Sequence, residues 1–152
     1  MFIAKEDLPY DADLQTIILN TEIAAGIEIP DARYKDWFPN FTLGDLICDD
    51  TATGLIVVGN KVDPLDIDAF AHVQLNLYKD EELIATGDSS EVLGNPLNAV
   101  LWLIKKLHSH GKQIKKGQVI SSGTFISPLK LEYGTYRAEY SGIGTVEFKV
   151  SK

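Results

Sequence analysis

One segment of the chain, residues 93–122, constrains the fold more than any other. It opens with a Gly-Asn-Pro turn at 94–96, and Pro suits the first turn of a helix because its missing N–H would have no partner there. Apolar residues then recur at helical spacing to about His110, and Gly111 ends the pattern. A basic loop and β-branched residues follow and predict a strand over 118–122. The chain therefore contains one long helix that leads into a strand.

The rest of the chain is predicted to consist mainly of strands. We expect strands at residues 2–5, 27–29, 54–58, 73–78, 82–86, 118–122, 135–140 and 145–150, and shorter helices at 13–25 and 42–47. Gly26 is expected to end the first of these helices. The strand at 54–58 has no polar alternation and is expected to be buried. The pattern predicts an α+β fold in a single domain over residues 1–152.

Composition excludes several classes of function. The formal net charge is −8 at pH 7, whereas proteins that bind nucleic acid or anionic lipid present a basic patch. No apolar run reaches the length of a membrane span, and the N-terminus has no signal-peptide pattern. Cys48 is the only cysteine, so no disulfide forms within the chain and a reducing, cytoplasmic location is expected. We expect neither a nucleic-acid nor a membrane partner.

Five segments in order resemble the C-terminal half of the 2-keto-4-pentenoate hydratases, in the fumarylacetoacetate-hydrolase superfamily. They are FIAKEDLP at 2–9, AAGIEIPDAR at 24–33, TLGDLICDD at 42–50, the stretch 87–102 with its Gly-Asn-Pro turn, and 117–123. Each motif on its own is common enough to occur by chance, and the resemblance rests on finding all five in the same order as in the family. It implies a mixed β-sandwich or β-roll with one long outer helix. It also implies an N-terminally truncated protein, because the first half of the family would precede Met1.

The resemblance implies a hydro-lyase of aromatic catabolism. The family adds water to a 2-keto-4-enoate of the 2-hydroxypenta-2,4-dienoate type with the help of Mg²⁺ or Mn²⁺, and a sister group decarboxylates 4-oxalocrotonate. A divalent ion chelated by the carboxylate and keto oxygens of the substrate relieves the charge that develops as a 2-keto acid enolises. The implied partners are a small 2-keto acid and further copies of the chain, in a homodimer or higher oligomer.

By the same resemblance, Glu28 corresponds to one of three carboxylates that hold the metal. The other two form a Glu-x-Glu pair on one strand, where a spacing of two places both on one face, and that pair would lie immediately before Met1. The Lys and Asp proposed to transfer protons would lie further upstream, so no catalytic residue is assigned. One carboxylate holds Mg²⁺ only weakly, and a solvent-facing strand carboxylate is the alternative for Glu28. We therefore expect weak or absent metal binding and an inactive isolated chain.

Two further pairs are candidates for the surroundings of Glu28. Asp31 and Arg33 either orient Glu28 or form a surface ion pair of small energy. Asp50 and Thr53 lie where the family often has an Asn followed by small hydroxyl residues near the substrate. Asp in place of Asn is unfavourable beside an anionic substrate unless a metal ion is close. A polar loop without a binding role is the alternative.

Ser122 and Gly123 match a Ser/Thr-Gly of the family at a strand end, where a hydroxyl and a bare backbone approach the substrate. An ordinary Ser-Ser-Gly turn is the alternative. Three hypotheses remain open at this point: a hydro-lyase, a folded remnant without catalytic activity, and one half of an enzyme that a separately encoded N-terminal half completes.

Overall fold

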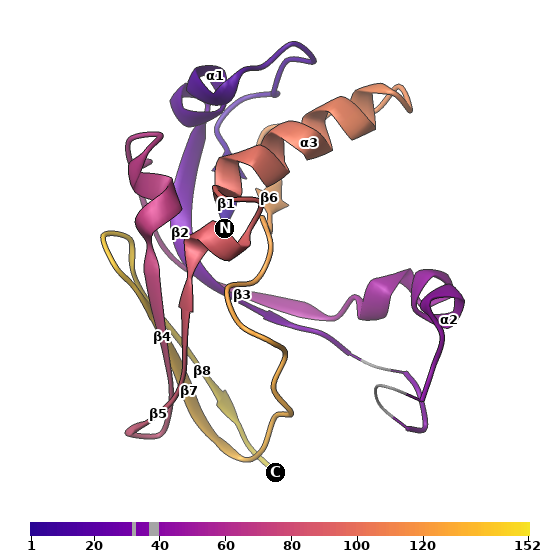
Figure 1. The fold of residues 1–152 in the computed structure, drawn as a ribbon, viewed down its shortest axis with the longest axis vertical. Helices are drawn as coiled ribbons and strands as arrows, with labels where there is room; N and C mark the ends of the chain where they lie inside the picture. Colours follow the sequence, from indigo (N-terminus) through magenta and orange to yellow (C-terminus); the bar gives the residue numbers. More distant parts are fainter. Residues whose placement is uncertain (32, 37–39) are drawn as a thin grey trace.

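The computed structural model describes residues 1–31, 33–36 and 40–152, and shows two antiparallel four-stranded sheets with one long helix (Figure 1). The strands are β1 (Phe2–Ala4), β2 (Thr21–Ile29), β3 (Leu55–Val62), β4 (Gln74–Lys79), β5 (Glu82–Asp88), β6 (Val119–Ile120), β7 (Gly134–Tyr140) and β8 (Gly144–Val150). The α-helices are α1 (Leu14–Leu19), α2 (Leu43–Cys48) and α3 (Pro96–His108). This content confirms the predicted α+β class.

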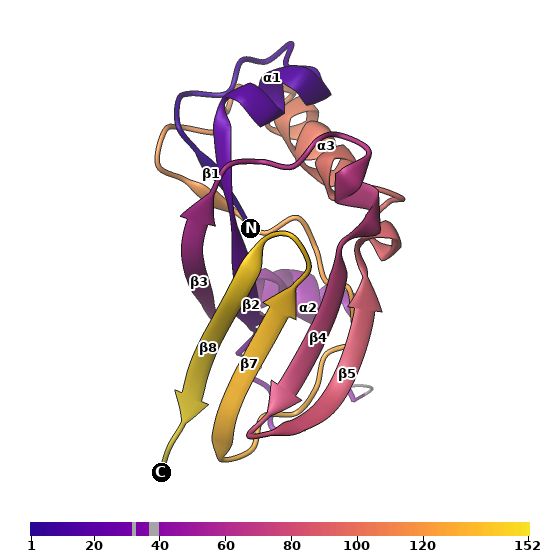
Figure 2. The same cartoon turned by 90° about the vertical axis from the view of Figure 1, so that its left-hand side faces the viewer.

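The two sheets lie against each other along one side. The first has the strand order β3-β2-β1-β6 and the second β5-β4-β7-β8, and β8 passes beside β3 (Figure 2). Gly59 of β3 permits this approach, because a Cβ there would lie 3.1 Å from the carbonyl oxygen of Thr145 and 3.2 Å from that of Ala25. The buried layer between the sheets consists of Ala25, Leu75, Leu77, Ala138 and Val146. The finer description as a sandwich or a roll stays a prediction.

The long helix α3 covers the larger hydrophobic core. The side chain of Asn95 caps its first turn by accepting from the backbone N–H of Leu97 at 3.0 Å, and the helix ends at His108, two residues before the expected end. Its apolar face packs with α1, β1 and β2, in a core that includes Ile17, Ile23, Leu97 and Val100. Within the described part of the chain, none of the helices has the length and apolarity that crossing a membrane requires.

Two predictions about local structure are wrong. The helix expected over 13–25 ends at Leu19, and β2 begins at Thr21, so Gly26 lies inside a strand. Pairing of β2 with β1 and β3 outweighs the helical spacing of its side chains. The strand expected to be buried at 54–58 is instead open at its start, where Leu55 is 70% and Ile56 is 47% exposed. This end of β3 runs out toward α2, away from α3 (Figure 1).

The side chain of Tyr140 links the two sheets. Its hydroxyl on β7 donates to the carbonyl oxygen of Gly26 on β2 at 2.7 Å, and burial raises the pKa of the phenol from 10.0 to about 12. We expect Tyr140→Phe to lower the free energy of unfolding by about 1–2 kcal/mol, because the Gly26 carbonyl loses this donor.

The same residue makes stability depend on pH. The folded pKa of Tyr140 lies above the unfolded value, so its contribution is complete below pH 10.0 and is lost as the pH rises to about 12. Urea denaturation of wild type and Tyr140→Phe, at neutral pH and at stepwise higher pH, checks both effects. The difference between the two proteins should shrink in alkali, and equal stability at neutral pH would contradict the link.

Candidate functional site

Glu28 lies near the end of β2, on the face of the first sheet that is turned away from the second sheet. Its neighbour Ile27 packs against the layer between the sheets, and successive strand side chains alternate between faces. Glu28 is exposed, and its Oε2 accepts a hydrogen bond from the hydroxyl of Ser121 at 3.3 Å. Ile56 pairs with Glu28 across the β2–β3 ladder, so its exposed side chain shares this face. Glu28 thus stands between a hydroxyl and an apolar side chain.

Beside Glu28, the described strand pairing of β2 is with β3. In the described part of the chain, β2 pairs with β1 only over 21–23, whereas its pairing with β3 continues through 26–29. Met1 lies opposite Ala24, with backbone hydrogen bonds of 3.0 Å in both directions. Glu28 is four residues beyond Ala24, so a strand continuing β1 upstream would place its fourth residue before Met1 opposite Glu28.

The two residues expected near the substrate after β6 do not contact Glu28. Ser122 lines a small cavity of about 30 Å³, in which Tyr140 is the other polar side chain; such a volume holds a water molecule. Gly123 has a φ of 128°, which L-residues rarely adopt, and a Cβ there would lie 3.2 Å from the side chain of Val92. This position therefore requires glycine for its backbone. Their role toward a substrate stays a prediction.

Ser121, whose hydroxyl donates to Glu28, is not among the residues predicted from the sequence. A usable signal was present, because Ile120 is apolar and a strand alternates its faces, so the next residue must point the other way. Ile120 is 6% exposed and Ser121 is exposed. Strand alternation alone does not identify Glu28 as the partner, since β1 separates β2 from β6 in the sheet.

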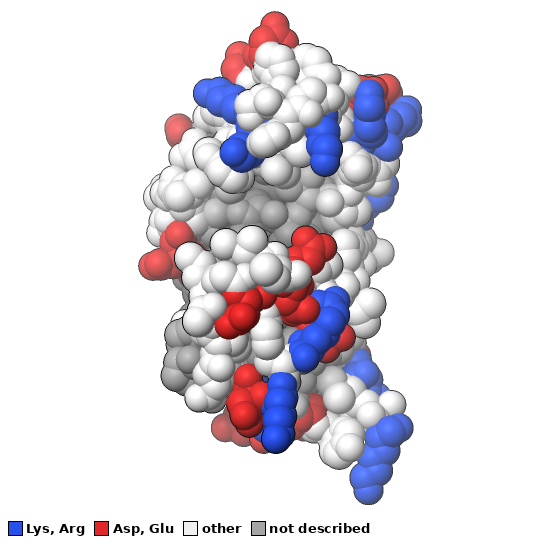
Figure 3. Space-filling model, turned by 90° about the vertical axis from the view of Figure 1, so that its right-hand side faces the viewer, with Lys and Arg blue, Asp and Glu red and all other residues white. Residues whose placement is uncertain are grey.

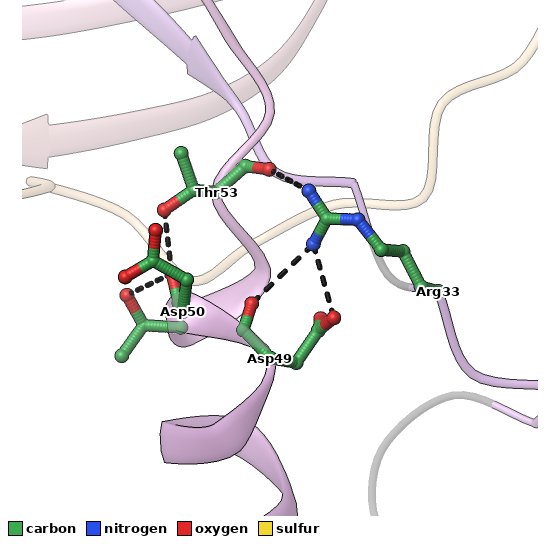
Figure 4. A network of polar contacts seen from close by, with 5 residues as sticks. Arg33, Asp49, Asp50 and Thr53 are labelled. Carbon is green, nitrogen blue, oxygen red and sulfur yellow. Dashed lines mark hydrogen bonds and ion pairs between the residues drawn. The ribbon is translucent and has the colours of Figure 1, made fainter.

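Arg33 ties the loop at 49–53 to the end of β2. Its guanidinium donates to the carboxylate of Asp49 at 3.0 Å and to the carbonyl oxygen of Thr53 at 2.6 Å (Figure 4). The backbone N–H of Asp31 donates to the carbonyl oxygen of Ala52 at 2.9 Å. The structure therefore brings the segment with Asp31 and Arg33 to this loop. The ion pair of Arg33 is made with Asp49 and not with Asp31, and an orienting effect on Glu28 stays a prediction.

The loop that Arg33 holds is strained. Asp50, Thr51 and Ala52 have φ values of 55°, 56° and 57°, a left-handed conformation that costs about 1–2 kcal/mol for each residue other than glycine. Strain of this kind concentrates at functional sites. The hydroxyl of Thr53 donates to the carbonyl oxygen of Asp50 at 2.5 Å. The proton of this hydroxyl therefore has a partner within the loop. The carboxylate of Asp50 is exposed, as a contact to a bound group would require.

The surface that carries α2 and α3 is hollowed between the two helices (Figure 3). Acidic side chains gather on the α2 side of this hollow, among them residues of α2 and of the loop that follows it. Basic side chains border the opposite side of the hollow, and Asp49 is paired with Arg33, so the rim is of mixed charge (Figure 3).

The side chains around Glu28 offer oxygen donors, the ligand type that a hard cation prefers, but too few of them to form a complete site. A carboxylate and a hydroxyl are the oxygen ligands that Mg²⁺ and Ca²⁺ prefer. Among residues 1–31, 33–36 and 40–152, however, no group of three or more His, Cys, Asp and Glu side chains could hold a metal ion. Glu28 can therefore supply one ligand, and a complete site would need further carboxylates.

Comparison with known proteins relates the chain to one enzyme family. No family model matches it. The 2-keto-4-pentenoate hydratase of Paraburkholderia phymatum is 32% identical over 130 residues, which cover 84% of this chain and 48% of that protein. The same enzyme of Burkholderia vietnamiensis is 34% identical over 124 residues, covering 80% and 46%. The chain is homologous to the C-terminal portion of the 2-keto-4-pentenoate hydratases. This hydratase homologue spans about half the length of the curated relatives it matches.

The fold of the hydratase homologue matches that of a solved enzyme. The structure of 4-oxalocrotonate decarboxylase from Pseudomonas putida G7, complexed with calcium and acetate, superposes with a TM-score of 0.78 at 22% identity. The match covers 96% of this chain and 56% of that chain. The chain thus shares the α+β fold of this decarboxylase, and the description of that fold as a sandwich or a roll stays a prediction. Structures of that decarboxylase hold calcium or magnesium.

Proposed function

We propose that the hydratase homologue forms one side of the active site of a divalent-metal-dependent hydro-lyase, which adds water to a 2-keto-4-enoate of the 2-hydroxypenta-2,4-dienoate type. The observation that carries the proposal is the place of Glu28, an exposed carboxylate on the part of β2 that extends past its described pairing with β1. The names of the relatives support the reaction class. The proposal includes a single domain and the cytoplasmic location expected from the sequence.

The other side of the site would come from a segment equivalent to the half of the relatives that this chain does not cover. A strand that continues β1 would run beside residues 26–28 of β2. Two carboxylates spaced two apart on that strand would share one face, and the strand register allows this to be the face of Glu28. A separately encoded N-terminal half is one source of such a segment.

In this site each described residue has a separate task. Glu28 holds one corner of the Mg²⁺ or Mn²⁺ site, and the ion supplies Lewis-acid stabilisation of the enolising keto acid. Ile56 offers the hydrocarbon part of the substrate an apolar contact next to Glu28. The loop with Asp50 and Thr53, held by Arg33, borders the site. No described residue is assigned a proton transfer, which leaves that task to the completing segment.

A fusion protein tests the proposal. The part of the Burkholderia vietnamiensis hydratase that this chain does not cover would be joined to Met1 of the chain. We expect Mg²⁺-dependent consumption of 2-hydroxypenta-2,4-dienoate, followed by the loss of its dienol absorbance and by chromatography of the product. The isolated chain, assayed in parallel, should show no turnover and a dissociation constant for Mn²⁺ in about the millimolar range, because one carboxylate binds weakly. A folded fusion protein without turnover would favour the non-catalytic remnant.

We also propose that the chain forms a dimer or a higher oligomer. Three large apolar side chains at the α2 end of the molecule are exposed: Leu43 by 72%, Ile47 by 62% and Leu55 by 70%. Exposed apolar clusters of this kind mark association surfaces. Light scattering at micromolar concentration should give at least twice the monomer mass, and Leu55→Asp should reduce it. A monomer under these conditions would contradict the expectation.

A further inference from the structure

We propose that residues 127–133 form an association edge, which pairs with the same segment of a second copy of the chain as two antiparallel strands about a two-fold axis at Leu131. This segment leads from β6 into β7 and runs beside the second sheet without belonging to it (Figure 1). It is not part of the exposed apolar cluster at the α2 end, and the inference goes beyond the proposed activity.

The segment is exposed and its backbone is almost unused. Every residue of it is exposed, including the large side chains of Leu129 by 46%, Leu131 by 38% and Tyr133 by 63%. In the described part of the chain, Glu132 has the only backbone N–H of the segment with a hydrogen bond, which it donates to the hydroxyl of Tyr136 at 3.0 Å. Unpaired backbone groups along an exposed apolar stretch are a template for pairing with another chain.

Strand geometry indicates which backbone groups stay free. In an extended segment, the N–H and C=O groups of successive residues point to opposite sides. The N–H of Glu132 points toward Tyr136 of its own chain, and Pro128, which has no N–H, lies on the same side because it is four residues away. The odd-numbered residues from 129 to 133 therefore direct their N–H and C=O groups outward, where a second strand can bind them.

The side chains of the segment complement a second copy in the antiparallel orientation. Pairing about Leu131 places Lys130 opposite the partner's Glu132, and Leu129 opposite the partner's Tyr133. Opposite charges and apolar side chains that face each other across two strands stabilise the pair, and a two-fold interface forms each of these contacts twice. A parallel pairing in register would instead place like charges side by side, so the charges favour the antiparallel pair.

Disulfide trapping of the full chain tests the pairing. The parent protein would be Cys48→Ser, which removes the exposed native thiol. Hydrogen-bonded partners in an antiparallel pair have Cα atoms about 5.5 Å apart, a spacing that a disulfide can bridge. We expect Leu131→Cys to form a covalent dimer in oxidised glutathione. Leu19→Cys, at a 64% exposed site on α1, is the matched control and should stay monomeric.

Charge reversal tests the register. Lys130→Glu and Glu132→Lys, each combined with Leu131→Cys, place like charges opposite each other in a self-paired dimer, so each variant alone should lose the cross-link. A one-to-one mixture of the two variants places opposite charges together again and should restore the cross-link. The net charge is −8 and each substitution changes it by two, so both variants stay acidic and a net attraction between them does not explain this result.

The outcomes decide the inference independently of the proposed activity, because trapping needs neither substrate nor metal. If Leu131→Cys forms no covalent dimer, if either charge variant alone keeps the cross-link, or if the mixture does not regain it, the pairing is overturned. The exposed segment would then be left to another partner, such as the segment that completes the hydratase site. Leu55→Asp should leave the cross-link unchanged, so a failure of the association at the α2 end would not overturn this inference. Unchanged circular dichroism should show that each variant is folded, including Glu132→Lys, which loses the ion pair with Lys79.

Discussion

Glu28→Gln should lower kcat/KM of the completed enzyme about 1,000-fold, which corresponds to about 4 kcal/mol of transition-state stabilisation. Glutamine has nearly the same size as glutamate but no charge, so it is a poor ligand for a hard divalent cation. Because Glu28 is exposed, the substitution should leave the stability of the fold nearly unchanged. The measurement is steady-state kinetics of the fusion protein as a function of Mg²⁺ concentration.

Glu22→Gln provides the matched control for this prediction. Glu22 lies on the same strand as Glu28, and its carboxylate pairs with the ammonium of Lys61 at 3.1 Å. A partly exposed ion pair of this kind contributes little to stability, and nothing places it near the metal site. We expect kcat/KM of Glu22→Gln to stay within about 3-fold of wild type. If Glu28→Gln does the same, Glu28 is not a metal ligand.

Leu97→Ala should lower the free energy of unfolding by about 3–4 kcal/mol. Leu97 lies in the first turn of α3 with 0% of its surface exposed, in the core that α3 shares with β1, β2 and α1. Truncation to alanine removes buried apolar surface and leaves a cavity. Alanine is the best helix former, so the loss would report packing and not helix propensity. The expected loss is a large share of the stability of a typical domain.

Leu19→Ala is the matched control for the core prediction. Leu19 makes the same leucine-to-alanine comparison at the end of α1, where its side chain is 64% exposed. We expect it to change the free energy of unfolding by no more than about 0.5 kcal/mol. Urea denaturation followed by circular dichroism gives both values. A loss below about 1 kcal/mol for Leu97→Ala would show that α3 packs less tightly than the structure indicates.

The helices whose signals are local could be predicted from the sequence. The segment of α3 carries Asn95 and Pro96 at its start, and Thr42 caps α2 through a capping box with Asp45. Asp13 likewise caps α1, where its side chain accepts from the backbone N–H of Thr16. Each of these contacts joins residues two or three positions apart, so a short stretch of sequence contains the whole interaction.

The extent of β2 and the exposure of β3 could not be predicted in this way. The apolar spacing after Asp13 fits a helix as well as a strand, and pairing with β1 and β3 decides between them. The apolar run at the start of β3 predicts burial. It lies exposed because this end of the strand extends away from the second sheet, a property of the assembled molecule.

For the candidate site, too, some residues could be predicted from the sequence and others could not. Strand alternation and a family resemblance pointed to Glu28, but Ser121 is 93 residues away in the chain. Arg33 was expected to act on Glu28 or Asp31, and the structure pairs it with Asp49 and the carbonyl oxygen of Thr53. Residues two apart on a strand are known to share a face, whereas the partner of a long side chain depends on which loop folds next to it.

The sequence by itself determined the resemblance to the hydratases and the start of the long helix at Asn95 and Pro96. Only the tertiary structure decided that Ser121 meets Glu28 and that Arg33 holds the loop at 49–53. The physical reason is the sequence separation of the residues that interact. Caps and alternation depend on neighbours in the chain, whereas strand pairing, burial and long-range hydrogen bonds depend on segments that meet only after folding.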